Sequence, residues 1–551
     1  MGEWQHGGRL IARTLRAHGI DTVFTLTGGH ISAIFDGCVA EGIRVVDVRH
    51  EQAAAHAADA YGRLTFRPGV AAVTAGPGVT DAVTGACNAL YANSPMLLLG
   101  GRNPLGLEGM GALQDAPQVD LLRPVTKRSE VALQSERLPE FVTYALRDAL
   151  SPRMGPVYLD LPMDVLMNGA DSDTVTIPRS QLFTHGPGPD PEAVAEVAAL
   201  IAGSSNPVIM SGSGTYWARA WGELRELAEV ARLPVYVNGM SRGILPSTHP
   251  NLLALTRKQA LRHADLVIAL GVDFDFRLGY GRGDGYQDLV KVIHVDPQAD
   301  KVGHNRDVHL GIVSDIRSFL TALLAHDGTI GRSEDPAHLV DLRADEAARR
   351  QARLEAASSD AAPIHPLRFA REVAEWLDPD GIVIGDGGDI VAHTAGFVAV
   401  DRPGSWMDPG PFGCLGVGAP FAMAAKVVHP DRPVTVVYGD GSFGFNGMEV
   451  ESAARQDLPF VGVIGNDGAW GEMKAFHERA YGPEAMVAQD LSQDTRYEDM
   501  AVALGGYGER VEKPDDIKPA LDRARESGVP AIVNVLLDRD FRRISATAYG
   551  A

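Results

Sequence analysis

Two short glycine-rich motifs in the last quarter of the chain carry residues that can bind a metal ion. They are 439–442 (GDGS) and 465–468 (GNDG), and each follows a run of apolar, β-branched residues that predicts a strand. The carboxyl ends of parallel strands meet at one edge of a sheet, so Asp440 and the amide oxygen of Asn466 can bind one hard cation. The backbone carbonyl of Gly468 would be a third oxygen ligand. This ligand set suits Mg²⁺, with phosphate oxygens and water completing an octahedral shell.

The same motifs contain groups that suit a phosphate. Gly441 allows the backbone to approach closely, and Ser442 adds a hydroxyl donor. A further turn at 385–389 (GDGGD) follows another strand-like segment, and the N–H groups of Gly387 and Gly388 at a helix start would form a second wall. The sequence therefore predicts a site for a diphosphate and its metal ion.

Strand-like and helix-like segments alternate in three successive parts of the chain. At 551 residues the chain is too long for one hydrophobic core. Polar, loop-like sequence separates the three parts, and the second break contains a charged helical segment. The pattern predicts an α/β protein with three doubly wound parallel-sheet domains, at 1–168, 190–326 and 364–551.

The paired motifs resemble the diphosphate–metal motif of thiamine-diphosphate-dependent enzymes, and the resemblance covers essentially the whole chain. One position differs, because Gly465 stands where that family usually has an asparagine, while the ligand position Asn466 is kept. The resemblance implies thiamine diphosphate and Mg²⁺ as cofactors. It also implies that the three domains are a pyrimidine-binding, a central and a diphosphate-binding domain.

The resemblance also gives roles to single residues of the first and third domains. Glu51 falls at the position of the carboxyl group that hydrogen-bonds N1′ of the cofactor's aminopyrimidine ring, and Pro77 falls in the pyrimidine-binding turn. Leu415 falls where a bulky apolar residue bends the cofactor into a V shape, and the Gly413 carbonyl would receive the 4′-amino group. In this family the first domain of one subunit meets the third domain of another, which implies a homodimer or homotetramer.

The substrate is predicted from loop segments, which resemble two branches of the family. Segments 443–451 and 111–118 resemble 2-hydroxyacyl-CoA lyases and oxalyl-CoA decarboxylases, whereas 28–35 and 49–54 resemble benzaldehyde lyase. Because both lyases cleave a carbon–carbon bond, we expect a carbon–carbon lyase that splits a 2-hydroxyacyl-CoA into formyl-CoA and a ketone or aldehyde. The resemblance leaves open which acyl chain is used and whether the reaction runs as cleavage or condensation.

Five side chains are candidates for substrate contacts. Gln114 and His30 could hydrogen-bond the substrate hydroxyl or carbonyl, and Trp470 could wall the pocket. The acyl-CoA relatives carry basic residues in their tails, and here Arg542 and Arg543 could bind the phosphates of coenzyme A.

Other interpretations stay open at this point. Asp296 ends a predicted strand of the central domain, where a nucleotide-binding fold places the acid that binds the ribose. The acyl-CoA relatives hold ADP in this domain, so ADP could bind here. FAD, which acetolactate synthases use, is a weaker alternative. The enzyme could also be a carboligase or decarboxylase on CoA-free substrates, similar to benzaldehyde lyase or acetolactate synthase. A protein with this fold that has lost its chemistry is disfavoured, because Glu51, Asp440 and Asn466 are intact.

Composition excludes several other classes. The net charge of −21 argues against binding to nucleic acid or to an anionic membrane, and no apolar run approaches the roughly 20 residues that span a bilayer. Cys38, Cys87 and Cys414 form no CxxC pair, so neither a disulfide framework nor a structural zinc site is expected. We expect a cytoplasmic protein.

Overall fold

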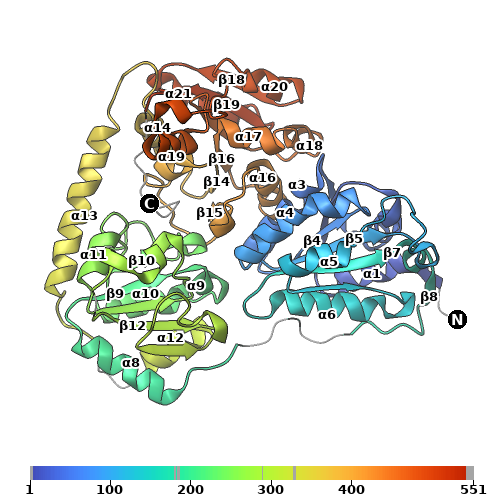
Figure 1. Cartoon of the computed structure of the whole chain (residues 1–551), viewed down its shortest axis with the longest axis horizontal. Coiled ribbons are helices and arrows are strands. Elements are labelled where there is room, and N and C mark those ends of the chain that lie inside the picture. Colours follow the sequence, from blue (N-terminus) through green and yellow to red (C-terminus); the bar gives the residue numbers. More distant parts are fainter. Residues whose placement is uncertain (1–3, 179–181, 183–185, 288, 327–329, 542–551) are drawn as a thin grey trace.

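The computed structural model describes residues 4–178, 182, 186–287, 289–326 and 330–541. Each of the three parts of the chain builds its own parallel sheet, with helices packed against it (Figure 1). The prediction of an α/β protein with three parallel-sheet units is confirmed.

The N-terminal sheet has six strands in the order β3-β2-β4-β5-β7-β6. Alternate residues of β4 enter different apolar clusters, since Val70 and Ala72 face one and Ala71 and Val73 the other. The strand is therefore buried on both faces, as a doubly wound sheet requires. The strands are β2 Thr22–Thr25, β3 Arg44–Asp47, β4 Gly69–Val73, β5 Met96–Arg102, β6 Arg128–Val131 and β7 Pro156–Pro162. The helices are α1 Gly7–Ala17, α2 Ser32–Glu41, α3 Glu51–Thr65, α4 Pro77–Tyr91, α5 Gln118–Leu122, α6 Leu138–Leu150 and α7 Met163–Met167.

The central sheet has five strands in the order β10-β9-β11-β12-β13. Its strands are β9 Pro207–Ser211, β10 Val235–Val237, β11 Leu266–Leu270, β12 Lys291–Asp296 and β13 Leu310–Val313. Its helices are α8 Pro191–Gly203, α9 Ser213–Trp217, α10 Trp221–Val230, α11 Arg257–His263 and α12 Ile316–Ala325. The charged segment predicted as a helix belongs to α13 (Ala337–Ala356), which runs alongside the central domain towards the third (Figure 1).

The C-terminal sheet has six strands in the order β15-β14-β16-β17-β19-β18. Its strands are β14 Ile382–Asp386, β15 Trp406–Met407, β16 Val434–Gly439, β17 Val461–Asn466, β18 Tyr507–Val511 and β19 Ala531–Leu536. Its helices are α14 Pro366–Trp376, α15 Asp389–Thr394, α16 Gly418–Val428, α17 Asp440–Asn446, α18 Glu449–Arg455, α19 Gly471–Tyr481, α20 Tyr497–Ala503 and α21 Ile517–Glu526.

The first and third domains pack directly against each other. Helix α3 contacts α16, and one apolar cluster continues through all three domains. A short antiparallel pair, β1 (Trp4–His6) with β8 (Gly169–Asp171), lies outside the three large sheets. In the parts of the chain that the structure describes, no helix combines the length and apolar character needed to cross a bilayer.

Candidate active site

The two glycine-rich motifs lie side by side at one edge of the C-terminal sheet. Strands β16 and β17 are neighbours, and Gly439 pairs with Gly465. Asp440, the first residue of α17, therefore lies beside Asn466, the last residue of β17. Two short helices, α17 and α18, lie between these strands, and the first begins at Asp440 itself.

The polar groups at this edge fit a hard cation. Oδ1 of Asp440 accepts a hydrogen bond from the Gly441 N–H at 2.9 Å, but Oδ2 is buried with no hydrogen-bond partner among the described residues. Burial, followed by the charge of Asp467, raises the pKa of Asp440 to about 7. Asn466 is buried, and its Oδ1 accepts from the N–H of Gly468 at 3.0 Å. A divalent cation here would compensate the buried charge, so these residues suit the Mg²⁺ role.

A second loop of the same sheet completes this edge. Gly387 and Gly388 follow β14 and precede α15, as expected. Asp386 is fully buried, and its carboxylate accepts from the N–H groups of Gly416 (3.0 Å) and Gly418 (2.8 Å). Burial raises the pKa of Asp386 to about 7. Asp386 thereby fixes the loop that carries Leu415, a function that sequence reasoning missed.

Most of the predicted cofactor-binding residues share one cavity of about 760 Å³. Trp470 also lines this cavity and packs on Gly441, where an added Cβ atom would lie 2.5 Å from the indole ring. Glycine is thus needed at 441 for this close packing. The predicted residues in the lining are Gly387, Gly388, Gly413, Leu415, Asp440, Gly441, Ser442 and Trp470.

The central domain contributes two cations to this cavity, and sequence reasoning missed both. Arg242 and Arg277 line it from the loops that follow β10 and β11. The Arg242 guanidinium lies over the Trp406 ring at 4.7 Å, and Arg277 is paired with Asp275 at 2.6 Å. Their position after the carboxyl ends of parallel strands was the available signal, because ligand-binding residues gather there.

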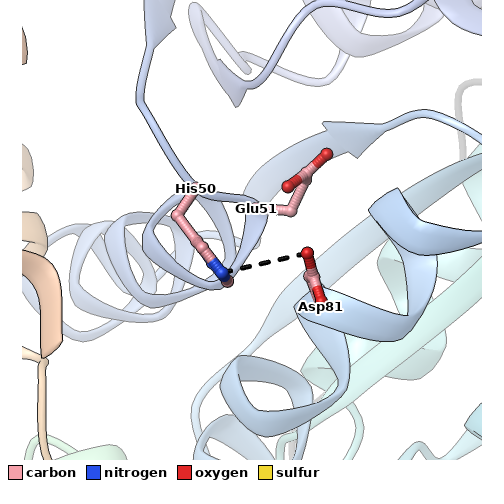
Figure 2. Close-up of side chains that lie close together, drawn as sticks. All are labelled: His50, Glu51 and Asp81. Atoms are coloured by element: carbon pink, nitrogen blue, oxygen red, sulfur yellow. Dashed lines mark ion pairs between the residues drawn. The ribbon is translucent and has the colours of Figure 1, made fainter.

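Glu51 lies apart from the cavity of its own chain. It is the first residue of α3 and is 8% exposed. It lies near His50 and Asp81, and side-chain atoms of the three residues lie within 4.8 Å of one another (Figure 2). His50 and Asp81 form an ion pair at 3.8 Å. Burial raises the pKa of Glu51, and the Asp81 carboxylate adds to this shift. A carboxyl group with a raised pKa keeps its proton more readily, which suits a group that must donate a hydrogen bond.

The other predicted residues of the first domain also lie outside that cavity as the structure describes it. Pro77 is the first residue of α4. His30 is held in place, with Nδ1 3.2 Å from Thr74 Oγ1 and Nε2 3.1 Å from Asn103 Oδ1. Gln114 is partly exposed and has a positive φ of 63°. The chain brings Glu51, Pro77, His30 and Gln114 together in one domain, and none of the four is among the residues that line the cavity beside the metal motif of the same chain.

The structure gives no support to a nucleotide at Asp296. Arg153, from the first domain, contacts both oxygens of this 1% exposed carboxylate at 3.1 and 2.7 Å and also pairs with Asp273. The cavity beside Asp296 measures only about 50 Å³, which is too small for ADP or FAD. Asp296, at the end of β12, therefore connects the central domain to the first domain through its ion pair with Arg153.

This contact leads to a stability prediction. Arg153→Ala leaves Asp296 buried without its countercharge, and breaking such a buried pair costs about 3–5 kcal/mol. We expect calorimetry to show a melting temperature several degrees lower, with thiamine diphosphate affinity unchanged. Arg317→Ala, which removes an exposed pair with Glu223, is the control and should change little. Equal melting temperatures for both variants would contradict the prediction.

The predicted coenzyme A contacts Arg542 and Arg543 lie outside the described residues. The described tail ends at Phe541, whose ring lies 4.6 Å from that of His365. The role of the two arginines stays a prediction.

Three α/β units, a sheet edge whose groups suit a phosphate and a cation, and a buried carboxyl group at the start of α3 are the features of a thiamine-diphosphate-binding protein. The comparisons agree. The N-terminal TPP binding domain, the central domain and the C-terminal TPP binding domain of thiamine pyrophosphate enzymes match residues 5–121, 194–323 and 386–535. The chain belongs to the thiamine pyrophosphate-dependent enzyme family.

Several relatives are similar over nearly their whole length. A "Probable acetolactate synthase" from Mycobacterium bovis is 40% identical over 97% of this chain and 96% of its own. Two proteins named "2-hydroxyacyl-CoA lyase 2" are 35% (Caenorhabditis elegans) and 34% (Homo sapiens) identical, over 98% of this chain and 90% and 91% of theirs. The family is therefore established, whereas the relatives' names divide between two reactions.

Proposed function

We propose that the protein is a thiamine-diphosphate- and Mg²⁺-dependent carbon–carbon lyase that cleaves a 2-hydroxyacyl-CoA into formyl-CoA and a ketone or aldehyde. The observation that carries the cofactor part is the buried, unpartnered Oδ2 of Asp440 beside Asn466. The substrate part is supported by the relatives named 2-hydroxyacyl-CoA lyase 2.

Each group of residues has a separate task in this proposal. When bound, thiamine diphosphate supplies a nucleophilic carbon that attacks the carbonyl carbon of the substrate. Asp440, Asn466 and the Gly468 carbonyl would hold the metal ion, and Leu415 would set the angle between the two rings of the cofactor. Arg242 and Arg277 line the same cavity and would attract an anionic substrate into an otherwise acidic protein. Glu51 would hold a proton on its carboxyl group facing N1′.

A second copy of the chain is needed to complete this site. Glu51 does not line the cavity of its own chain as described, so we propose that it faces the cavity of a partner in a homodimer or homotetramer. Exposed apolar side chains at the cavity suit such an interface: Phe412, which lines it, is 40% exposed, and Phe445, whose ring contacts that of Trp470, is 53% exposed. Each copy would then contribute Glu51 to one active site and its metal motif to the other.

A substrate panel tests the reaction. Purified enzyme with thiamine diphosphate and Mg²⁺ is given a series of 2-hydroxyacyl-CoA thioesters, and formyl-CoA is measured; pyruvate is given separately, and CO₂ and acetolactate are measured. Formyl-CoA release supports the lyase. Acetolactate formation without formyl-CoA would favour the second candidate function, an acetolactate-synthase-like reaction. The 40% identity to the mycobacterial protein supports this candidate. If no cofactor binds at all, the protein is a non-catalytic member of the fold.

The tail provides a separate test of coenzyme A binding. Deleting residues from Phe541 onward should raise KM for a CoA thioester at least about tenfold, since one lost contact of about 1.4 kcal/mol suffices. Cleavage of a small CoA-free hydroxyketone should be affected less. Equal losses on both substrates would speak against a phosphate contact and for the benzaldehyde-lyase-like alternative.

A further inference from the structure

Helix α18 of the third domain contacts the start of helix α3 in the first. The Glu449 carboxylate accepts the N–H of Arg49 on both oxygens, at 2.9 and 3.1 Å. Glu449 is 1% exposed, and Arg49 stands two residues before Glu51. A carboxylate beside a helix N-terminus interacts favourably with the helix dipole. Its hydrogen bonds also fix the backbone at Arg49, directly before His50, the N-cap residue of α3. Glu449 therefore fixes the backbone that carries the Glu51 carboxyl group.

Two further contacts hold the same connection between β3 and α3. The Arg455 guanidinium pairs with the Asp47 carboxylate at 2.8 Å. The Gln456 side chain donates to the Asp47 carbonyl at 2.7 Å. We call Glu449, Arg455 and Gln456 the α18 clamp. It holds the short segment from 47 to 49 at both of its ends.

The clamp is continuous with the metal motif of its own chain. Helix α17 begins at Asp440 and ends at Asn446, and α18 begins at Glu449. The Asn446 side chain donates to the carbonyl of Gly416 at 2.6 Å, next to Leu415. Two consecutive helices thus connect the diphosphate loop, the Leu415 loop and the start of α3.

We propose that Glu449 is a positioning residue for Glu51, and that it ties the position of the Glu51 carboxyl group to the diphosphate loop of the same chain. The inference rests on the proposed function, in which Glu51 must meet N1′ of the cofactor. Removing the Glu449 carboxylate takes away the acceptor of the Arg49 N–H group and releases the start of α3. A misplacement of about 1 Å at a reacting group can cost about a hundredfold in rate.

Glu449→Ala and Glu449→Gln test this inference with two measurements. In the apoenzyme, hydrogen–deuterium exchange read by mass spectrometry should show lost protection at residues 49–55 in Glu449→Ala. In the holoenzyme at saturating cofactor, exchange of the cofactor C2 proton, followed by NMR, should slow by about 10–100-fold. Glu449→Gln keeps one acceptor oxygen and should fall between wild type and Glu449→Ala in both measurements.

Glu346 offers a matched control. Its buried carboxylate caps helix α11 of the central domain in the same way, with Oε2 accepting the N–H groups of Leu255 at 2.8 Å and Thr256 at 3.1 Å. Glu346→Ala should lower the melting temperature and leave C2 exchange of the bound cofactor at the wild-type rate.

The outcomes separate this inference from the proposed function. If Glu51→Ala slows C2 exchange and Glu449→Ala does not, Glu449 is only a stabilising cap and the inference is wrong. If Glu449→Ala slows exchange no more than Glu346→Ala does, the effect is one of general stability, and the inference is again wrong. If Glu51→Ala itself leaves exchange unchanged, the proposed role of Glu51 fails.

Discussion

Glu51→Ala should fold normally, bind thiamine diphosphate and Mg²⁺, and lose turnover by about 10²–10⁴-fold, the usual contribution of one acid–base group. The side chain is buried at the first position of α3, and burial raises its pKa, so the carboxyl group keeps its proton more readily and suits a hydrogen bond to N1′ of the cofactor. Alanine removes that proton and leaves the metal motif, in another domain, untouched. Exchange of the C2 proton of the bound cofactor, followed by NMR, measures this step directly.

Two further variants sharpen the Glu51 prediction. Glu51→Gln preserves shape and a hydrogen-bond donor but cannot give up its proton, so it should exchange nearly as slowly as alanine. Asp81→Asn removes a neighbouring charge that raises the pKa of Glu51 but keeps the carboxyl group itself, so its effect should be much smaller. A wild-type exchange rate in Glu51→Ala would refute the assignment.

The interior of each sheet could be predicted from the sequence, whereas four edge strands could not. Central strands such as β4 and β14 are buried along their whole length and read as continuous apolar runs. Within the three large sheets, the strands that no apolar run predicted are β6, β13, β15 and β18, and each lies at the edge of its sheet; the small β1–β8 pair was not predicted either. All four strands are short. Strands β6 (RSEV) and β18 (YGERV) also carry polar side chains, so their pattern resembles that of a loop, whereas β13 (LGIV) and β15 (WM) are apolar but only four and two residues long.

The site residues also fall into two groups, those that the sequence could predict and those that it could not. Asp440 and Asn466 could be paired from the sequence because each directly follows a predicted strand, and strand order then brings them together. Asp386, Arg242 and Glu449 were missed as contributors because their contacts cross between loops or domains distant in sequence. The ribose-binding prediction for Asp296 is unsupported for the same reason, since Arg153 comes from another domain.

Asp440→Ala should lower the affinity for thiamine diphosphate, with Mg²⁺ present, by at least about a hundredfold, because losing an outer-shell partner of a metal already costs about 10–100-fold. Asp440 is buried, its Oδ2 is unpartnered in the described chain, and the diphosphate would lose the cation that compensates its charge. Calorimetric titration measures this affinity. Asp440→Asn keeps one oxygen ligand and should lose less. Asp522→Ala, on α21 of the same domain, should bind as wild type does.

Mixing the two inactive variants tests the site and the assembly together. If each site takes Glu51 from one copy and Asp440 from the other, a hybrid dimer of Glu51→Ala with Asp440→Ala contains one doubly altered site and one intact site. Random reassociation of equal amounts makes half of the dimers hybrid, so about a quarter of wild-type turnover should return. Mixing each variant with itself is the control and should restore nothing. If Glu51 instead served the metal motif of its own chain, every site in the mixture would carry one substitution, and no activity could return.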